Sequence, residues 1–265
     1  MSKKLFKKIH LWLSVPFGLI ITVVCLSGAA LVFESEITTL YREQARKVSP
    51  DNGRSPLEVE ELQDKIEKVF NSPVAVERVV KDPDPAKAYL FIVSSPVREA
   101  IWIDQYTGEI RDKSGKLPFF EVMLGLHRNL MIPSSYSEVQ WGRIIVGVSV
   151  ISFIIILLSG IAIWVPKKRS QWRLRCNLFS LHALGGIYVM VFLLLMAVTG
   201  LTWSFGWWHD IVYAIPGVSR GLVTALHIGA YAGLTGRIIA FIAALFGATL
   251  PLTGYWLWWK RIKKA

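Results

Sequence analysis

Four apolar stretches of the sequence are each long enough to cross a lipid bilayer as a helix, which takes about 20 predominantly apolar residues. They cover residues 11–33, 144–165, 178–205 and 238–259, and none has Asp, Glu, Lys or Arg in its interior. Across the chain 53% of the residues are hydrophobic, which argues against an ordinary soluble domain. We therefore predict an all-α membrane protein with four transmembrane helices embedded in the lipid membrane.

The positive charges are placed as in a membrane protein. The net charge of +11 would also suit a nucleic-acid-binding protein, but Lys and Arg concentrate in three segments without Asp or Glu. These segments precede the first stretch, join the second to the third and follow the fourth: Lys3, Lys4, Lys7, Lys8, Lys167, Lys168, Arg169, Arg173, Arg175, Lys260, Arg261, Lys263 and Lys264. The positive-inside rule then predicts that both termini are cytoplasmic. Because membrane topology accounts for the positive charge, we expect no nucleic-acid partner.

The basic start and the first apolar stretch also resemble a secretory signal peptide. However, the apolar run at residues 11–33 is longer than the usual signal core of about 7–15 residues. The duplication described below also requires this helix. We therefore expect residues 1–33 to be retained as the first transmembrane helix.

Residues 34–120 are polar enough to form a small domain on the extracytoplasmic side, between the first helix and the remaining membrane domain at residues 121–265. Ser55 followed by Glu58 resembles a capping box at the start of a helix. Residues 74–81, 87–95 and 99–112 are rich in β-branched and aromatic residues, with a turn at Thr107–Gly108. We predict one helix and a small antiparallel sheet, forming a structural or partner-binding α+β module.

The membrane part contains an internal duplication. The helix at 11–33 resembles that at 178–205, and the helix at 144–165 resembles that at 238–259. In all four, a glycine that follows Ser or Thr lies 18 residues after a common marker: His10 to Gly28, His182 to Gly200, Gly142 to Gly160, and Gly236 to Gly254. Because both copies start on the cytoplasmic side, we predict two parallel-repeat helix pairs related by an axis along the membrane normal.

Four of the five histidines obey this repeat. His10 and His182 begin the first helix of each copy, whereas His127 and His227 each follow a leucine shortly before the second helix. We expect His10 to face His182 near the inner surface and His127 to face His227 near the outer surface. Ionisable side chains at membrane depth are candidates for function.

Two facing imidazoles suit the two axial positions of a haem iron. Zinc usually takes three or four protein ligands, with Cys or carboxylates among them, and none accompanies these histidines. Cys25 and Cys176 belong to no CxxCH motif, so haem would not be attached covalently. We therefore predict two b-type haems, one for each histidine pair.

The repeated glycines are expected at the same depths as the histidines. A rise of 1.5 Å per residue carries 18 residues across about 27 Å, nearly the bilayer core. Gly28 and Gly200 would then lie beside the outer haem, and Gly160 and Gly254 beside the inner one. They would leave room for a porphyrin, or they would only let helices pack closely through small residues.

Three arginines lie at the predicted outer ends of the helices, where the positive-inside rule disfavours positive charge. Arg128, Arg143 and Arg237 are predicted to contact the propionates of the outer haem, because a guanidinium matches carboxylate geometry. Lys7, Lys8, Arg173 and Arg175 could serve the inner haem, although topology alone explains them.

Three further residues are candidates for substrate contact. His209 lies beside Trp207 and Trp208 and has no partner in the repeat, so it is either an interfacial residue or a contact for substrate or metal near the outer haem. Glu34 and Glu36 follow the first helix and are either ligands of a ferric substrate or simply solvated.

The ordered motifs resemble the PepSY-associated transmembrane helix family of bacterial inner-membrane proteins. They are KIHLWL with LSGAALVFE, LHRNLMIP with GRIIVG and LSGIAIW, LHALGGIYV with VTGLTW, and LHIGAYAGLTGRII with LTGYWLWWKR. The stretch IWIDQYTGEI is similar to the PepSY-type domain of these proteins, here in a short form. The resemblance implies di-haem reductases of ferric iron or ferric siderophores at the periplasmic face, with the four matching histidines as haem ligands.

The resemblance, added to the two histidine pairs, implies a ferric reductase that receives electrons from a cytoplasmic or quinol donor. No GxGxxG fingerprint for FAD or NAD follows a strand, so the donor must be external. One alternative is a cytochrome b subunit that exchanges electrons with quinone in a larger complex. Another is a non-enzymatic membrane module whose PepSY-like domain binds a partner.

Overall fold

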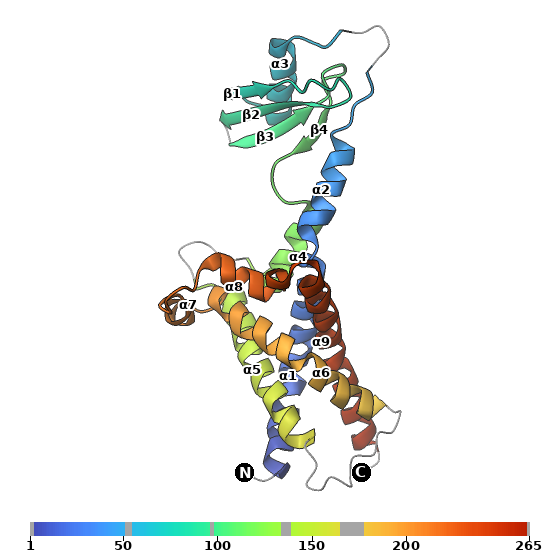
Figure 1. Ribbon diagram of the computed structural model, residues 1–265, viewed down its shortest axis with the longest axis vertical. Coiled ribbons are helices and arrows are strands. Elements are labelled where there is room, and N and C mark those ends of the chain that lie inside the picture. Colours follow the sequence, from blue (N-terminus) through green and yellow to red (C-terminus); the bar gives the residue numbers. More distant parts are fainter. Residues whose placement is uncertain (1–2, 51–54, 96–97, 134–138, 165–177, 264–265) are drawn as a thin grey trace. The chain divides into compact units, whose positions relative to one another are not determined.

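The structure is a computed structural model that describes residues 3–50, 55–95, 98–133, 139–164 and 178–263 (Figure 1). The chain forms two compact units. The helical unit comprises residues 1–33 and 119–265, and the α+β unit comprises residues 34–118. The sequence predicted the second unit at residues 34–120.

Four long helices form the helical unit: α1 (Lys3–Leu31), α5 (Trp141–Trp164), α6 (Leu178–Gly200) and α9 (Gly233–Ile262). Each is long and apolar enough to cross a membrane, with α6 continued by a 3₁₀ turn, η2 (Leu201–Trp203). The prediction of four membrane helices is confirmed. Helix α1 begins eight residues before its apolar stretch, because Lys and His residues at a helix end are compatible with helical backbone.

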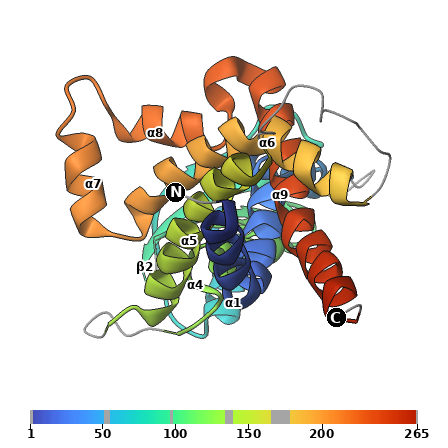
Figure 2. The same ribbon diagram turned by 90° about the horizontal axis from the view of Figure 1, so that it is seen from below.

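The long helices pack so that α1 contacts α5 and α9, while α6 contacts the same two helices (Figures 1 and 2). Ile21, Phe153, Leu193 and Leu250, one from each helix, are buried in a common core. Helix α9 buries a row of small residues, Ala240, Ala243, Ala244, Gly247 and Ala248. Small residues allow helix backbones to approach closely, which is how membrane helices gain packing energy.

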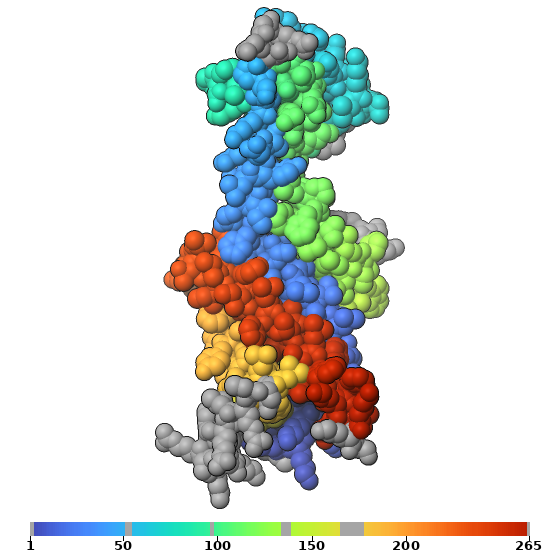
Figure 3. All heavy atoms as spheres, turned by 90° about the vertical axis from the view of Figure 1, so that its right-hand side faces the viewer, coloured from blue at the N-terminus to red at the C-terminus, as the bar shows by residue number. Residues whose placement is uncertain are grey.

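Short helices precede two of the long ones. Helix α4 (Pro118–Asn129) leads into α5, while α7 (Gly206–Tyr213), α8 (Arg220–His227) and the 3₁₀ turn η3 (Ala230–Ala232) lead into α9. Helix α8 contacts α6, and Figure 3 shows α6, α8 and α9 together on one face of the helical unit. Neither α4 nor α8 was predicted as a helix, since both are short amphipathic segments outside the apolar stretches.

The α+β unit consists of α2 (Glu34–Ala45), α3 (Val59–Phe70) and a sheet of β1 (Ala75–Val80), β2 (Tyr89–Ser95), β3 (Glu99–Ile103) and β4 (Ile110–Lys113). The strands are antiparallel and follow chain order. Leu62 and Ile66 of α3 pack on Phe91, Val93 and Ile101 of the sheet. The predicted antiparallel sheet is confirmed, and α2 is a second helix that was not predicted.

The predicted cap at Ser55 is wrong. Helix α3 begins at Val59 with Glu58 as its N-cap. The backbone N–H of Leu57 donates instead to the carbonyl of Gln105, at 2.8 Å. Because Pro56 disfavours helical backbone at the preceding residue, the chain stays extended here and joins the β3–β4 turn before the helix starts.

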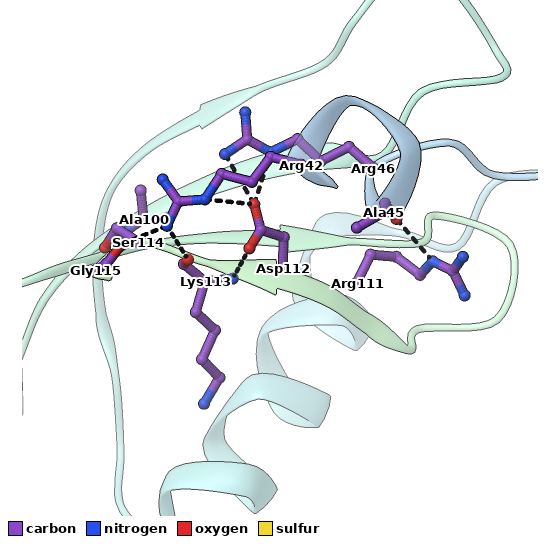
Figure 4. A network of polar contacts seen from close by, with 9 residues as sticks. All are labelled: Arg42, Ala45, Arg46, Ala100, Arg111, Asp112, Lys113, Ser114 and Gly115. Atoms are coloured by element: carbon purple, nitrogen blue, oxygen red, sulfur yellow. Dashed lines mark hydrogen bonds and ion pairs between the residues drawn. The ribbon is translucent and has the colours of Figure 1, made fainter. Parts of the chain in front are cut away.

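A buried carboxylate ties α2 to the sheet (Figure 4). Asp112 accepts a 2.8 Å hydrogen bond from Arg46 Nε, and Arg42 Nε lies 3.6 Å from the same carboxylate. The guanidinium of Arg46 also lies 3.4 Å from the ring centre of Trp102. This network holds the C-terminal half of α2 against β3 and β4.

Candidate functional site

Four histidines of the helical unit come together in two pairs. The His10 pair consists of His10 on α1 and His182 on α6, with ring centres 6.4 Å apart and ring planes at 85°. The His127 pair consists of His127 on α4 and His227 on α8, with ring centres 6.0 Å apart and planes at 63°. All four side chains are half-buried. These are the two pairings that the repeat predicts.

A cavity of about 290 Å³ lies at the His10 pair. Helices α1, α5, α6 and α9 all contribute to its walls, which are mostly apolar and include Phe153, Met190, Tyr255 and Trp258. His10 and His182 bring imidazole nitrogens into this mostly apolar space. The cavity is thus shaped for a largely apolar ligand that meets imidazole from two sides.

All hydrogen bonds of these imidazoles among the described residues involve Nδ1. His10 Nδ1 donates to the carbonyl of Ile156 at 3.0 Å, and His127 Nδ1 donates to the carbonyl of Val24 at 2.8 Å. A carbonyl can only accept, so the proton of each ring is on Nδ1. The lone pair on Nε2 then remains available as a ligand.

In three of the four histidines, Nδ1 also lies within hydrogen-bonding distance of a Ser or Thr hydroxyl. His182 Nδ1 lies 2.7 Å from Thr253 Oγ1, and His227 Nδ1 lies 3.0 Å from Thr199 Oγ1. Both hydroxyls donate their proton to carbonyls of their own helix, as do Ser and Thr within helices generally. They must therefore accept from the imidazole. His10 likewise lies 3.1 Å from Ser159 Oγ.

The glycine that follows each hydroxyl residue touches the same imidazole. A Cβ atom added at Gly28 would lie 2.8 Å from Cε1 of His127, which is too close, and one added at Gly200 would lie 3.0 Å from Cε1 of His227, a tight contact that requires the ring to move by a few tenths of an ångström. At Gly160 and Gly254 the corresponding distances, to His10 and His182, are 3.5 and 3.6 Å, which is ordinary contact. The four glycines thus lie at their predicted histidines. Their predicted role in making room for a porphyrin remains a prediction.

The Ser or Thr before each glycine is visible in the sequence, but its role is not. The structure places Ser159, Thr199 and Thr253 within hydrogen-bonding distance of a histidine. We call Ser27–Gly28, Ser159–Gly160, Thr199–Gly200 and Thr253–Gly254 the hydroxyl–glycine pairs. Their recurrence at the 18-residue spacing was the signal that could have revealed them.

Close backbone contacts anchor the histidine-bearing short helices. A Cβ at Gly142, the first glycine of α5, would overlap the carbonyl of Asn129, two residues after His127. A Cβ at Gly236 in α9 would overlap the carbonyl of Gly229, two residues after His227. The glycine of each GRII motif therefore seats the end of α4 or α8 on the following long helix.

Burial keeps the imidazoles of the His127 pair neutral. It lowers the pKa of His127 below its ordinary value, and the neighbouring Arg128 lowers it further. Burial lowers the pKa of His227 to about 4, with a smaller contribution from His127. Neutral imidazole is the form that binds metals, so these two rings are ready to act as ligands at neutral pH.

The predicted arginines hold helix ends. Arg143 donates to the carbonyl of Trp203 at 3.1 Å from Nε, and to Gln140 at 2.6 Å. Arg237 donates to the carbonyl of Val32, and its guanidinium lies 5.3 Å from the ring centre of Phe33. Both thus bind carbonyls just beyond Gly200 and Gly28.

Arg128 is exposed beside His127. Contact of the three arginines with propionates stays a prediction. Lys7 and Lys8 are exposed on the first turns of α1, whereas Arg173 and Arg175 lie outside the described residues.

The three candidates for substrate contact are engaged with other side chains, and Glu36 accepts a 2.9 Å hydrogen bond from Ser35 Oγ. His209 Nδ1 lies 3.0 Å from Asp210 on α7, and its ring centre lies 4.5 Å from that of Tyr213. Glu34 forms an ion pair with Lys116 inside the α+β unit. The ring centre of Trp203 in η2 lies 5.2 Å from that of His227, so this indole packs against the His127 pair.

The histidine pairs fit axial ligation of a haem iron. A metal–imidazole bond of about 2 Å on each side puts the two ring centres roughly 6 Å apart. The observed 6.4 and 6.0 Å are close to that value. Among the described residues no group of three or more His, Cys, Asp or Glu is placed to hold a bare metal ion. The donor sets therefore suit a metal whose remaining ligands come from a macrocycle.

Comparisons with known proteins agree with this architecture. The family described as PepSY-associated TM region matches residues 7–217 and 212–261. No curated protein matched the chain. The family match includes all four long helices and both histidine pairs, and the chain belongs to the PepSY-associated TM region family.

Proposed function

We propose that this chain is a transmembrane electron-transfer protein that binds two b-type haems and reduces ferric iron or a ferric siderophore at the periplasmic face. Its electrons come from a cytoplasmic or quinol donor. The observation that carries the proposal is the geometry of the two histidine pairs. Each pair has ring centres about 6 Å apart and protons held on Nδ1, which supports bis-histidine ligation.

The proposal includes an orientation in the bacterial inner membrane. The basic residues in the first turns of α1 and around the end of α9 favour cytoplasmic termini, with the α+β unit in the periplasm. The His10 pair then lies towards the cytoplasm and the His127 pair towards the periplasm. The shared packing partners of α1 and α6 support two parallel-repeat helix pairs.

The residues of this chain would hold and insulate the two groups. His10 and His182 supply one pair of axial nitrogens and His127 and His227 the other. Haem iron, when bound, supplies one-electron oxidation and reduction. Apolar residues such as Phe153 and Met190 line the cavity at the His10 pair and would surround a bound group with apolar side chains. Such a lining would limit the access of water to the group.

Spectroscopy and fast kinetics test the proposal. The full chain is purified in detergent, its spectrum is recorded, and the dithionite-reduced protein is mixed with ferric siderophores in a stopped-flow instrument. We expect a bis-histidine b-type spectrum and oxidation by at least one ferric chelate. A protein without a haem signal would contradict the proposal. Oxidation by a quinone but by no ferric chelate would favour the cytochrome b alternative instead.

A further inference from the structure

The four hydroxyl–glycine pairs share one local design. Each is preceded, three residues earlier, by a residue whose carbonyl interacts with the same histidine: Val24, Ile156, Met196 or Leu250. His10, His182 and His227 thus each meet a carbonyl, a hydroxyl and a glycine of one helix. His127 meets the carbonyl of Val24 and Gly28, whereas the Ser27 hydroxyl bonds within α1. The design occurs once on each of α1, α5, α6 and α9.

The helix that carries the design is never the helix that carries the histidine. His10 on α1 is held by α5, and His182 on α6 is held by α9. His127 on α4 is held by α1, and His227 on α8 is held by α6. The orientation of each ring is therefore set by a neighbouring helix, and ring rotation would break a contact between helices.

The hydroxyl oxygens are committed acceptors. Thr253 Oγ1 lies 3.0 Å from the carbonyl of Thr249 and 2.9 Å from that of Leu250, so its only proton is used within α9. Thr199 Oγ1 lies 2.6 Å from the carbonyl of Leu195. Each oxygen can then only accept from Nδ1–H. A hydrogen bond of this kind fixes the tautomer of a ligand histidine and raises its basicity.

We propose that Ser159, Thr199 and Thr253 are positioning residues for the haem ligands, holding the Nδ1 proton so that Nε2 is the ligand nitrogen and is made more basic. The expected effect of these hydroxyls on haem binding rests on the proposed function. Their expected effect on the position of the imidazole proton does not. Loss of one hydroxyl would weaken haem at its own pair and shift that haem's potential upward, because a less basic ligand stabilises ferric iron less. The other pair would keep its properties.

Thr253→Val is the sharpest test, since valine keeps the shape and removes the acceptor. The matched control is Thr249→Val, one turn earlier on α9, whose exposed hydroxyl donates to Phe246 and touches no histidine. Thr253→Ser should restore the bond. We expect haem affinity at the His10 pair to fall about 10- to 100-fold in Thr253→Val, with a positive shift in one potential only. Wild-type values are expected for the control and near-wild-type values for Thr253→Ser.

A second measurement needs no haem. Nitrogen-15 NMR of histidine-labelled, haem-free chain, with His182 assigned from a His182→Asn sample, reports which ring nitrogen is protonated. We expect the Nδ1–H tautomer in wild type and a mixture in Thr253→Val. A wild-type proton on Nε2, or identical haem affinity in Thr253→Val and Thr249→Val, would overturn the inference. If wild type binds no haem, the proposed function fails, and the tautomer alone decides the role of Thr253.

Discussion

At the scale of single residues, each of the four paired histidines contacts a histidine of its own pair. His227 contacts His127 and Thr199 but neither member of the His10 pair. We expect His227→Ala, and equally His127→Ala, to lower the haem content from two per chain to one and to spare the His10 pair. Haem-to-protein ratios and redox titrations measure this. His209→Ala is the control, because His209 is bonded to Asp210 and lies in neither pair. Loss of both haems, or of none, would contradict the pairing.

The glycines separate two explanations that the sequence left open. A methyl group at Gly28 would press on His127, so Gly28→Ala should destabilise the fold by about 1–3 kcal/mol even without haem. A methyl group at Gly160 makes only ordinary contact with His10, so Gly160→Ala should not destabilise the haem-free chain and should raise its stability by up to about 1 kcal/mol, because alanine is the better helix former. A drop in haem affinity for Gly160→Ala would then support porphyrin clearance. Unchanged affinity would leave Gly160 as a helix-packing residue.

Sequence reasoning found the histidines because chemistry, spacing and repetition coincide at those positions. It did not assign the hydroxyls, since Ser and Thr are common in membrane helices and their partners lie on other helices. The outer arginines were singled out by position, and their contact with propionates stays a prediction. The structure adds the backbone carbonyls that Arg143 and Arg237 bind, which the sequence did not reveal. Which neighbour a long side chain reaches depends on packing, and that information is non-local.

At the scale of elements, the short helices depend on the long helices that follow them. The carbonyl of Gly229 contacts Gly236, which seats α8 on α9. We expect Gly236→Ala to push α8 away, to cost about 1–3 kcal/mol and to lower haem occupancy at the His127 pair. Thermal unfolding and haem titration check this. Gly233→Ala is unsuitable as a control, because Gly233 has a φ of +62° and alanine there would strain the backbone.

Ala244→Gly serves better as the control for Gly236→Ala. Ala244 lies on the same helix in the small-residue row, and its loss affects packing without moving α8. It should lower stability by about 1 kcal/mol through the glycine in a helix, and leave the haem content unchanged. Equal haem loss in both variants would show that α9 packing in general, and not the seat of α8, is responsible.

The α+β unit has its own critical element contact. Removing the Asp112 carboxylate leaves the guanidinium groups of Arg42 and Arg46 without their shared acceptor. We expect Asp112→Asn to loosen α2, costing about 1–3 kcal/mol. Limited proteolysis of the full chain should then cut sooner within residues 34–50. Glu109→Gln is a suitable comparison, because its ion pair with Arg111 is largely exposed and contributes little.

Elements of high apolar content were predictable, and elements defined by contacts were not. Hydropathy located α1, α5, α6 and α9 because a bilayer imposes length and polarity directly. Runs rich in β-branched and aromatic residues, with a turn at Thr107–Gly108, located the strands. In the structure Gly108 has a φ of +73°, as such a turn requires. Helix α2 was missed because its mean polarity resembles that of a loop, and its place is set by Asp112 on another element. The start of α3 was misplaced because Leu57 bonds Gln105, a partner distant in sequence.

At the scale of the whole molecule, the proposed orientation predicts which residues face which compartment. Lys68 on α3 and Lys260 on α9 are both exposed lysines. In intact cells, a membrane-impermeant maleimide should label Lys68→Cys and not Lys260→Cys, with both labelled after lysis. Both variants are made in a Cys25→Ala, Cys176→Ala background to remove the native thiols. Labelling of Lys260→Cys in intact cells would reverse the orientation and exchange the roles of the two pairs.

Helices α1 and α6 each contribute residues to both histidine pairs, so the rotation about the helix axis between the two ends of each helix is fixed. His10 and Gly28 are 18 residues apart, as are His182 and Gly200, and at 3.6 residues per turn this interval is about five full turns. One inserted residue would rotate the far end by about 100° relative to the near end. The histidine at one site or the glycine at the other would then point away from its partner. The interval between them can therefore change only by whole turns, however freely its apolar side chains vary.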